Sequence, residues 1–561
     1  MKPHIQAAIA TLVAFRLIAQ TVAQTPALPQ ATEPPPPVLR VTTRLVQVSV
    51  IVTGKKSEPV TGLTKDDFVV LDKGKPQQIQ FFSEEAYGVL PPQKDQKPLP
   101  VNLFSNKLEH RSNAPTAITV ILLDMLNTKF QDQVYARNQL IKFLQQLKPT
   151  DRVALYALGR ELRVLHDFTS DASSLLRTLA KHTGKPNPDL EAGDLDPDFD
   201  SWLDQSVVMN DFLQVRRTHT TFEALTAIAN HVTNLPGRKN LIWISSGFPF
   251  TMGMADDGRA NLNREVRVFS EESENTARAL NNANMAIYPV DARGLFTDPA
   301  FSAENRSVSG NPRMSTGKKG NSNPRPPANS GAKLRNLTKT QDIMNILANR
   351  TGGRAFYNTN DLKKAIQTAV EDSKVTYNIG YYPAGIEWDG RYREIKVQVK
   401  KPGTHVRHRL GYFAFPEKDL TPKQKETFLK DAVWSPLDST DLGMIVRIDV
   451  LDPKKPNTAR VIVNAEARKV QWETEGDRQK ATIDMLFLTT VQGQAAKGET
   501  DTMKLALTKD NFAKIMKEGI TTMKQLDLPP DAYQLRVVMR DEKSGAIGSV
   551  TVPLNEKTLK R

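Results

Sequence analysis

The sequence predicts a multidomain protein in which a central, doubly wound, mainly parallel α/β sheet is flanked by all-β parts. Three observations predict this fold class. The chain has 561 residues, which is too long for one ordinary domain. Its middle alternates continuous apolar runs with segments of helical periodicity. Both outer parts contain short runs with apolar–polar alternation, which is typical of half-buried strands.

The first residues have the composition of an export signal. Lys2 provides a positive start, and residues 5–18 are mostly apolar. We therefore expect a signal peptide over 1–23, with an N-terminal anchor or an amphipathic helix as alternatives, and a Pro-rich spacer over 24–39. No later stretch reaches ~18 consecutive apolar residues, so we expect no membrane span after signal removal and a location in the periplasm, the cell envelope or outside the cell.

A small β module is expected over 40–85. Val46, Val48 and Val50 alternate with polar residues, and two more short strands follow. The next segment, 86–115, is polar and rich in proline, which predicts a linker.

The central α/β domain is expected over 116–415. Its apolar runs end at polar residues, notably at Asp124, at Ser245-Ser246 and at Asp291, as buried parallel strands do. Residues 297–339 are rich in Asn, Ser, Gly, Pro and basic residues, which predicts a flexible basic insertion.

The remaining segments are predicted to be mostly strands. Residues 375–414 contain three strands, either as an antiparallel extension of the central sheet or as a small β appendage. A second linker is expected over 416–440. Alternating runs over 441–561 predict a β-sandwich of immunoglobulin-like type.

Several stretches resemble a known family. VILLDMLNT, TTFEALTAIANHV and LIWISSGFP resemble the first, middle and fourth elements of a von Willebrand factor A-type domain. The flanking stretches VTTRLVQVSVIVTGKKSEPVTGLTKDDF and YNIGYYPAGIEWDGRYREIKVQVKKPGTHVRHRLGYFA are similar to the VWFA-related proteins of Acidobacteria. The resemblance covers roughly Val41 to Ala414 and leaves the C-terminal sandwich outside.

This resemblance implies a metal-ion-dependent adhesion site, in which a D-x-S-x-S loop, a Thr and an Asp hold Mg²⁺. Asp124 matches the first Asp and Thr128 matches the second Ser, but Leu126 occupies the position of the first Ser. Leu126 has no oxygen to donate to a cation. Asn127 or Asp132 could substitute as a ligand.

The other two ligand positions also depart from the pattern. Thr220 matches the Thr before the central helix, although Thr218 and Thr221 compete for this role. Ser246 stands where the family has its last Asp. A single carboxylate makes a weak magnesium site, so we expect a degenerate site with Asp124, Thr128 and Thr220 as its possible metal ligands. Asp124 could instead brace the loops, and Thr220 could cap a helix. Asp291 could likewise brace the turn formed by Arg293 and Gly294.

The expected function is therefore non-enzymatic binding at a face carrying Asp124, Asn127, Thr128, Thr220 and Ser246. Two alternatives remain. One is a purely structural scaffold. The other is an envelope hydrolase that uses Asp124, Asp291 and His219 at the same face. The chain has no cysteine, which excludes thiolate catalysis and Cys-based metal sites.

The net charge of +14 favours anionic partners. We expect a protein or an anionic envelope polymer as partner. Nucleic acid is not expected, because the basic insertion has almost no aromatic residues on which bases could stack. The oligomeric state stays open.

Overall fold

The computed structural model describes Leu45 to Asn555, apart from residues 87–99, 108–116, 192–202, 249–269, 296–329, most of 415–428 and several gaps of one to three residues. The expected signal peptide and the Pro-rich spacer lie outside the described residues, as does most of the basic insertion. Within the described residues, no helix has both the length and the apolar character needed to cross a membrane.

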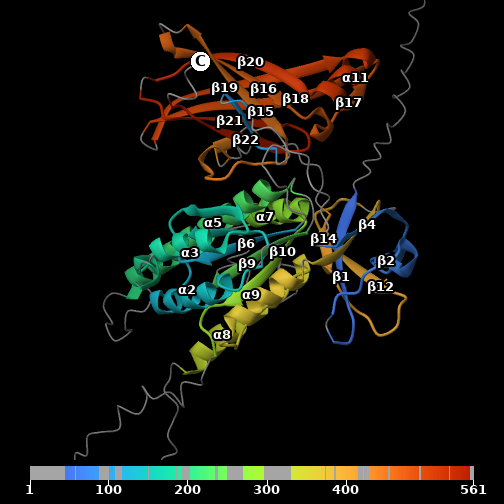
Figure 1. Cartoon of the computed structure of the whole chain (residues 1–561), viewed down its shortest axis with the longest axis vertical. Coiled ribbons are helices and arrows are strands. Elements are labelled where there is room, and N and C mark those ends of the chain that lie inside the picture. The colour runs from blue at the N-terminus through green and yellow to red at the C-terminus, as the bar shows by residue number, and fades with distance from the viewer. Residues whose placement is uncertain are drawn as a thin grey trace, which may run out of the picture. The chain divides into compact units, whose positions relative to one another are not determined.

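The central domain contains a five-stranded sheet in the order β10-β9-β6-β7-β8 (Figure 1). Four strands run parallel, and β8 at one edge is antiparallel. The strands are β6 (Ala117–Asp124), β7 (Val153–Leu158), β8 (Leu162–Thr169), β9 (Arg238–Ser245) and β10 (Met285–Asp291). All of β7, β9 and β10 is buried. This explains the apolar runs of these strands, although β9 begins with three buried polar residues, Arg238 to Asn240.

Helices cover both faces of this sheet, as the fold class predicted (Figure 1). One face packs against α5 (Leu203–Val232), α7 (Ser270–Ala283) and α8 (Ser330–Thr351). The other packs against α2 (Phe130–Leu144), α3 (Ala172–Lys181) and α9 (Leu362–Glu371). A further short helix, α4, spans Pro188–Glu191.

Helix α8 begins inside the segment expected to be a flexible insertion. Residues 330–339 are helical, whereas the prediction placed them in the insertion. The sequence allows this extension because 330–339 contains no proline, while Pro324, Pro326 and Pro327 precede it.

The small β module is built from two segments that the sequence analysis had kept apart. Its N-terminal elements are β1 (Val46–Thr53), the 3-10 turn η1 (Lys65–Asp67), β2 (Phe68–Asp72), β3 (Lys75–Gln77) and β4 (Ile79–Ala86). Its later strands are β11 (Val375–Tyr381), β12 (Tyr392–Val399), β13 (His405–Arg407) and β14 (Gly411–Phe413). They form the four-stranded sheets β13-β1-β11-β4 and β14-β12-β2-β3 around one shared core.

Residues 375–414 therefore do not extend the central sheet, and residues 40–85 do not form a module alone. Both segments need the other, because β1 is buried over most of its length and pairs along its two edges with β11 and β13. Val48 and Val50 pack with Tyr377 and Ile379 in the core that results.

The C-terminal part is a β-sandwich with one core shared by two antiparallel sheets. The first sheet has the order β20-β16-β15-β5, and the second is β17-β18-β21-β22 with β19 paired to β18. Its elements are β15 (Met444–Asp452), β16 (Lys455–Ala465), η8 (Ala467–Lys469), β17 (Glu473–Glu475), β18 (Arg478–Val491), β19 (Gln494–Leu507), α11 (Lys509–Glu518), β20 (Ile520–Asp527), β21 (Gln534–Asp541) and β22 (Ile547–Pro553). An immunoglobulin-like topology stays a prediction.

Both expected linkers contribute to this sandwich. Strand β5 (Leu103–Ser105) lies in the first linker and pairs with β15. The next residue, Asn106, is fully buried and hydrogen-bonds to three backbone groups of the sandwich segment. In the second linker, Ala432 and Val433 pack against Val538. These segments were misassigned because three strand residues are too few for a periodic signal.

Candidate functional site

The carboxyl ends of three parallel strands meet at one edge of the central sheet. Strand β6 ends at Asp124, β9 at Ser245 and β10 at Asp291. The register pairs Asp291 with Ser245, and Leu123 with Ile244. The three polar side chains thus come from neighbouring strands, at the edge where open α/β sheets bind their ligands.

The carboxylate of Asp124 is surrounded by hydrogen-bond donors of the protein. Asp124 is 2% exposed. Its Oδ2 accepts from Trp243 Nε1 at 3.0 Å and from Ser245 Oγ at 2.9 Å. Asn127 donates its backbone N–H to Oδ1 at 2.9 Å and its side-chain amide to Oδ2 at 3.0 Å. These donors satisfy both carboxylate oxygens without any added group.

Two opposing effects set the pKa of Asp124. Burial, the larger effect, raises the pKa, and the hydrogen bonds from Asn127, Trp243 and Ser245 lower it. Arg217 on helix α5 adds a nearby positive charge. Burial lowers the pKa of Arg217, and the negative charge of Asp124 partly offsets this effect.

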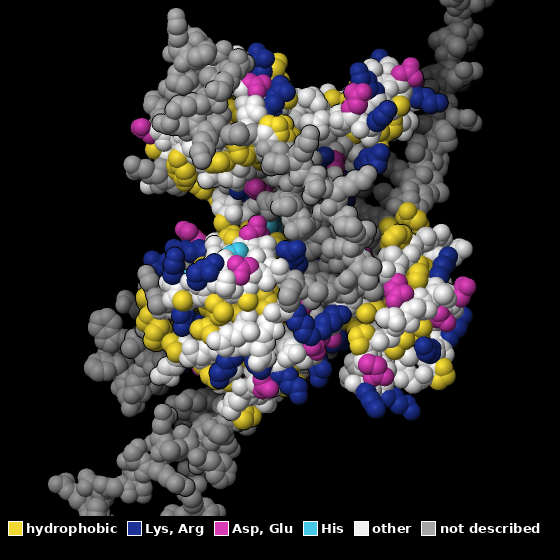
Figure 2. Space-filling view, viewed as in Figure 1, with side chains coloured by type: hydrophobic (Ala, Val, Ile, Leu, Met, Phe, Trp, Pro, Cys, Tyr) yellow, Lys and Arg dark blue, Asp and Glu magenta, His cyan; other side chains and the backbone are white. Residues whose placement is uncertain are grey.

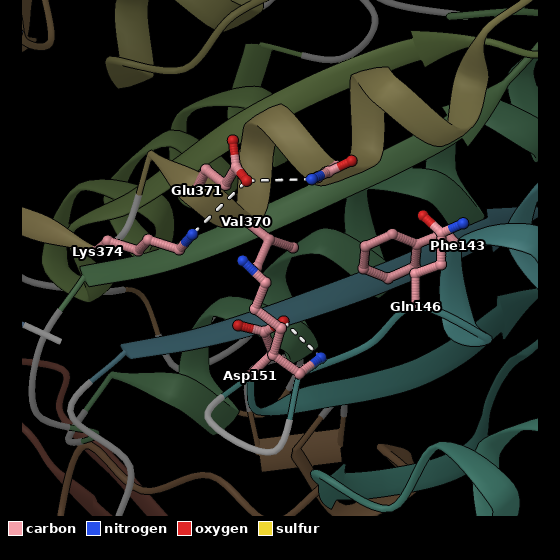
Figure 3. Close-up of a pocket in the computed structure, with 8 residues that line it drawn as sticks. Phe143, Gln146, Asp151, Val370, Glu371 and Lys374 are labelled. Atoms are coloured by element: carbon pink, nitrogen blue, oxygen red, sulfur yellow. Dashed lines mark hydrogen bonds and ion pairs between the residues drawn. The ribbon is translucent and has the colours of Figure 1, made fainter. Parts of the chain in front are cut away.

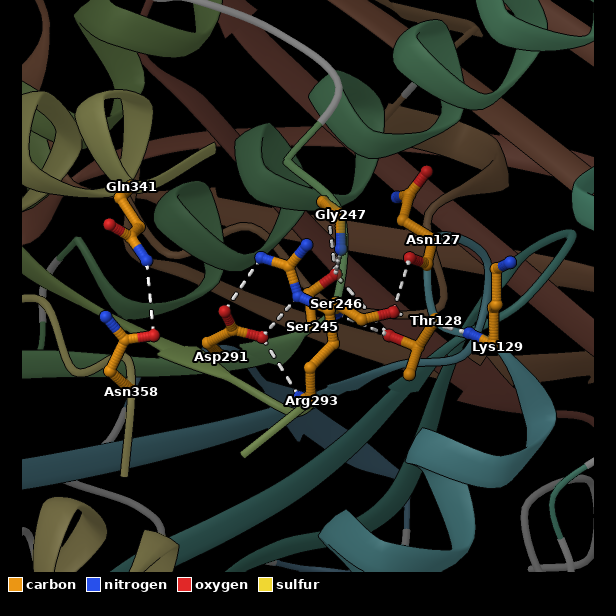
Figure 4. Close-up of polar contacts among 10 residues, drawn as sticks. All are labelled: Asn127, Thr128, Lys129, Ser245, Ser246, Gly247, Asp291, Arg293, Gln341 and Asn358. Carbon is orange, nitrogen blue, oxygen red and sulfur yellow. Dashed lines mark hydrogen bonds and ion pairs between the residues drawn. The ribbon is translucent and has the colours of Figure 1, made fainter. Parts of the chain in front are cut away.

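Thr128 and Ser246 connect the loops that follow β6 and β9 (Figure 4). The backbone N–H of Ser246 donates to Thr128 Oγ1 at 3.1 Å. Ser246 Oγ accepts from Lys129 N at 3.4 Å and donates to Asn127 O at 3.4 Å. Thr128 is buried, whereas Ser246 is half-buried and so remains partly accessible.

The structure brings Asp124, Asn127, Thr128 and Ser246 together, and we call these four residues with Ser245 the strand-end site. On α5, the threonine that reaches this site is Thr221, because Asn127 Nδ2 donates to Thr221 Oγ1 at 3.1 Å. Thr220 is one position earlier on the helix and points elsewhere, since successive helical residues differ by about 100°.

Beside the strand-end site, Asp291 holds Arg293, in the turn that the sequence indicated Asp291 could brace. Arg293 donates from Nε to Asp291 Oδ1 at 2.9 Å and from an Nη nitrogen to Oδ2 at 2.7 Å (Figure 4). Asp291 is 2% exposed, while the Arg293 side chain is 29% exposed. This fork fixes the guanidinium at the sheet edge and leaves part of it open to solvent.

Asp132 in the first turn of α2 completes this polar edge. Burial raises its pKa and exceeds the lowering effects of the Ser246 hydroxyl and of Arg293, while Asp291 raises it further. Asp132 therefore links the strand-end site to the Asp291–Arg293 pair through Ser246.

The oxygen atoms of the strand-end site do not fit the ligand set that Mg²⁺ needs. The only carboxylate there, Asp124, already accepts from three protein residues. Leu126 is 3% exposed and belongs to the hydrophobic core. Nowhere in the described part of the chain do three His, Asp or Glu side chains gather as a metal site would require. Too little negative charge is left to displace the water shell of the cation.

The three groups of the hydrolase alternative have different partners. His219 lies 3.4 Å from Glu223 on the same helix, Asp291 binds Arg293, and Asp124 binds the donors described above. No described contact gives any of them the base–nucleophile geometry that general base catalysis needs.

A shallow pocket lies at the opposite edge of the sheet, near the ends of α2 and α9 (Figure 3). Phe143 and Val370 line it beside Asp151, whose pKa is raised by burial. Lys148 N donates to Asp151 Oδ2 at 3.1 Å, and Lys374 pairs with Glu371 at 3.6 Å. These contacts are formed within the pocket wall and include no residue of the strand-end site.

No protein-family model matches this chain, and no curated protein matches its sequence. Several solved structures match parts of this chain, with low TM-scores. An aerotolerance-related membrane protein from Bacteroides fragilis has 14% identity and a TM-score of 0.23, covering 46% of this chain and 98% of that chain. The vWF domain of the type V pili tip protein Mfa5 from Porphyromonas gingivalis has 11% identity and a TM-score of 0.20, covering 32% and 81%.

The pilus adhesin SpaC from Lactobacillus rhamnosus GG has 8% identity and a TM-score of 0.24, covering 86% of this chain and 71% of that chain. Because these TM-scores are low, the fold of the central domain is assigned from its own strand order and helices.

Proposed function

We propose that this chain is an exported, non-enzymatic binding protein of the VWFA-related type, which captures a protein partner at the strand-end edge of its central domain. The observation that carries the proposal is the fixed guanidinium of Arg293. Asp291 binds this guanidinium with two hydrogen bonds, and 29% of the Arg293 side chain stays exposed. A charged group that is already ordered loses little entropy when a partner binds it.

Binding at this edge needs no metal in our proposal. Asp124 acts as a hydrogen-bond acceptor that orders the loops after β6 and β9, through Asn127 and Ser245. The loops then present Ser246, Arg293 and Asp132 as contact groups. This division of roles supports a binding face more than a scaffold, because a scaffold has no need for a partly exposed, fixed charge.

The test uses a displayed library of random peptides as the probe. Peptides enriched on the purified chain are synthesised and their affinities measured by fluorescence anisotropy, with magnesium or with EDTA. We expect Arg293→Ala to weaken binding by roughly tenfold or more and EDTA to have no effect.

The matched control is Arg447→Ala in the C-terminal sandwich. Arg447 binds Asp449 two residues along the chain, just as Arg293 binds Asp291. An equal loss in both variants would reject the strand-end edge as the binding face. A saturable heat of Mg²⁺ binding by calorimetry would reject the metal-free mechanism, and failure to enrich any peptide would favour the scaffold.

A further inference from the structure

One end of the small β module carries five lysines on three turns, which we call the lysine tip. Lys55 and Lys56 follow β1, Lys65 lies in η1, and Lys400 and Lys401 follow β12. All five side chains are exposed. In Figure 2, basic side chains gather at the end of this module.

Backbone pairing holds these turns side by side. Strands β1 and β13 pair through Thr53 and His405. A Cβ placed on Gly403 would lie 3.4 Å from Cε of Lys55, so the Lys55 side chain lies over the turn after β12. The backbone N–H of Lys400 donates to Asp67 O at 2.9 Å, which ties η1 to the same surface. The lysines therefore form one patch, although 345 residues separate Lys55 from Lys400.

The positive charge of the lysine tip is only partly balanced. Among the described residues, no ion pair joins any of the five lysines to a carboxylate. Three carboxylates lie at this end of the module: Glu58, Asp66 and Asp67. The five lysines therefore outnumber the carboxylates by two. Asp67 is bound to Thr64, whose N–H and hydroxyl donate to its Oδ2 at 2.7 and 2.9 Å and lower its pKa, and the charges of Lys400 and Lys401 lower that pKa by a smaller amount.

We propose that the lysine tip binds a linear polyanion, a polymer with regularly spaced phosphate or carboxylate groups. Lysine ammonium groups on separate turns act as point charges, which suit a flexible chain of anions better than one bidentate ligand. The site is separate from the strand-end edge and does not depend on the function proposed there.

Two other anionic partners fit the lysine tip less well. None of the exposed large hydrophobic side chains of the described residues lies in its turns, so it lacks the apolar anchors with which surface-binding proteins enter a bilayer. The same turns have no aromatic ring on which a nucleic-acid base could stack.

The experiment measures binding of long-chain polyphosphate to the full chain by calorimetry at several salt concentrations. We expect the variant Lys55→Gln/Lys56→Gln/Lys400→Gln/Lys401→Gln to bind at least roughly tenfold more weakly. The slope of log K against log salt should become shallower by about 3, because each phosphate contact contributes about 0.7 on a single-stranded polyanion.

The matched control changes four exposed lysines of β19 and α11 in the C-terminal sandwich, giving the same change in net charge: Lys504, Lys509, Lys514 and Lys517. An equal loss of affinity in the control would show that total charge, and not the lysine tip, drives binding, and this would overturn the proposal. Absence of polyphosphate binding to the unaltered chain at low salt would also overturn it. Vesicles of phosphatidylglycerol form a second arm. Tighter binding to vesicles than to polyphosphate would replace the polymer with a membrane surface. Arg293→Ala should leave polyphosphate binding unchanged, which keeps this test independent of the strand-end edge.

Discussion

Replacing Asp124 with alanine tests whether this carboxylate holds the strand ends together. The change removes the acceptor of three residues in a region where Asp124 is 2% exposed. Trp243 Nε1 and the Asn127 amides lose a partner that water cannot easily replace. Ser245 loses less, because its hydroxyl is also 2.7 Å from Gly247 O and can donate there.

The expected loss of stability follows from these orphaned donors. A buried donor left without an acceptor costs roughly 1–3 kcal/mol, and here two residues are left in that state. Part of the cost is offset, because burial of the Asp124 charge is itself unfavourable and raises its pKa. We therefore expect the opening free energy of the sheet edge to fall by about 3 kcal/mol.

Native-state hydrogen exchange with mass spectrometry is the suitable assay, since a chain of 561 residues with several cores does not unfold in one step. Peptides from β6 and β9 should exchange faster in Asp124→Ala, while peptides from β18 in the sandwich should not change. Asp361→Ala is a graded control in the same domain: it removes the N-cap of α9 and should cost about 1 kcal/mol.

The reasoning would be refuted by an Asp124→Ala variant whose β6 and β9 amides exchange as in the unaltered chain. In that case the hydrogen bonds to Asp124 would contribute nothing net. A heat of Mg²⁺ binding that disappears in the variant would point to a metal ligand in place of a hydrogen-bond acceptor.

Three further substitutions have definite expected outcomes. Asn106→Ala removes side-chain hydrogen bonds of 2.6–2.9 Å to the backbone of Ser439, Leu442 and Met444. Hydrogen exchange of β15 should show a loss of roughly 3 kcal/mol in opening free energy. The control Lys107→Ala should show almost no loss, because the ion pair of Lys107 is only partly buried. His408 accepts the N–H of Val397 at 3.0 Å, and burial lowers its pKa below the ordinary 6.5. The pKa of His408 is lower in the folded than in the unfolded state, so the stability that neutral His408 contributes is present above pH 6.5 and is lost as the pH falls below it. In a melting series from pH 7.5 to 5, His408→Gln should remove this part of the acid sensitivity. A variant with an unchanged pH profile would contradict the prediction. Gly353→Ala should destabilise β10 by more than about 2 kcal/mol, because its Cβ would lie 1.9 Å from the backbone oxygen of Ile287. Gly476→Ala meets open space and should cost about 1 kcal/mol from its positive φ alone. Hydrogen exchange of β10 in the first variant and of β18 in the second measures the two losses, and equal losses would count against this clash.

The central sheet could be predicted because its signals are local. The parallel strands are buried on both faces and so appear as mainly apolar runs, and those of β6 and β10 end at a polar residue, Asp124 and Asp291. Helices of several turns between these runs then require a doubly wound arrangement.

The β module and strand β5 could not be assigned correctly, because their pairing is remote in sequence. Ser49 and Asn378 are 329 residues apart and yet hydrogen-bond across neighbouring strands at 2.6 Å. Alternation shows that a segment is a strand and which side is apolar, but it does not identify the partner. Strand β5 has only three residues, all half-buried, and the buried residue that follows it, Asn106, carries no hydrophobic signal.

The strand-end site was predicted in part for the same reason. Residues directly after a strand, such as Asn127 and Ser246, could be placed because the strand end fixes them. The choice between Thr220 and Thr221 depended on the rotation of a helix, which one residue shifts by about 100°. The contact between Asp291 and the turn at Arg293 was predicted from the sequence, but only as a structural brace and not as a fixed, partly exposed charge.

The replacements at the strand-end site act together. With Leu126 in the hydrophobic core and Ser246 in place of a carboxylate, Asp124 is the single carboxylate of the strand-end site, and it is buried. A buried carboxylate must be neutralised or hydrogen-bonded, and Trp243 and Asn127 supply those hydrogen bonds. The same donors that make Asp124 acceptable without a cation also leave it no free lone pair for one. Arg293 supplies a fixed and partly exposed positive charge at this edge, because its partner Asp291 is buried and separate from Asp124. An edge built in this way offers a partner a fixed positive group in place of an open coordination site.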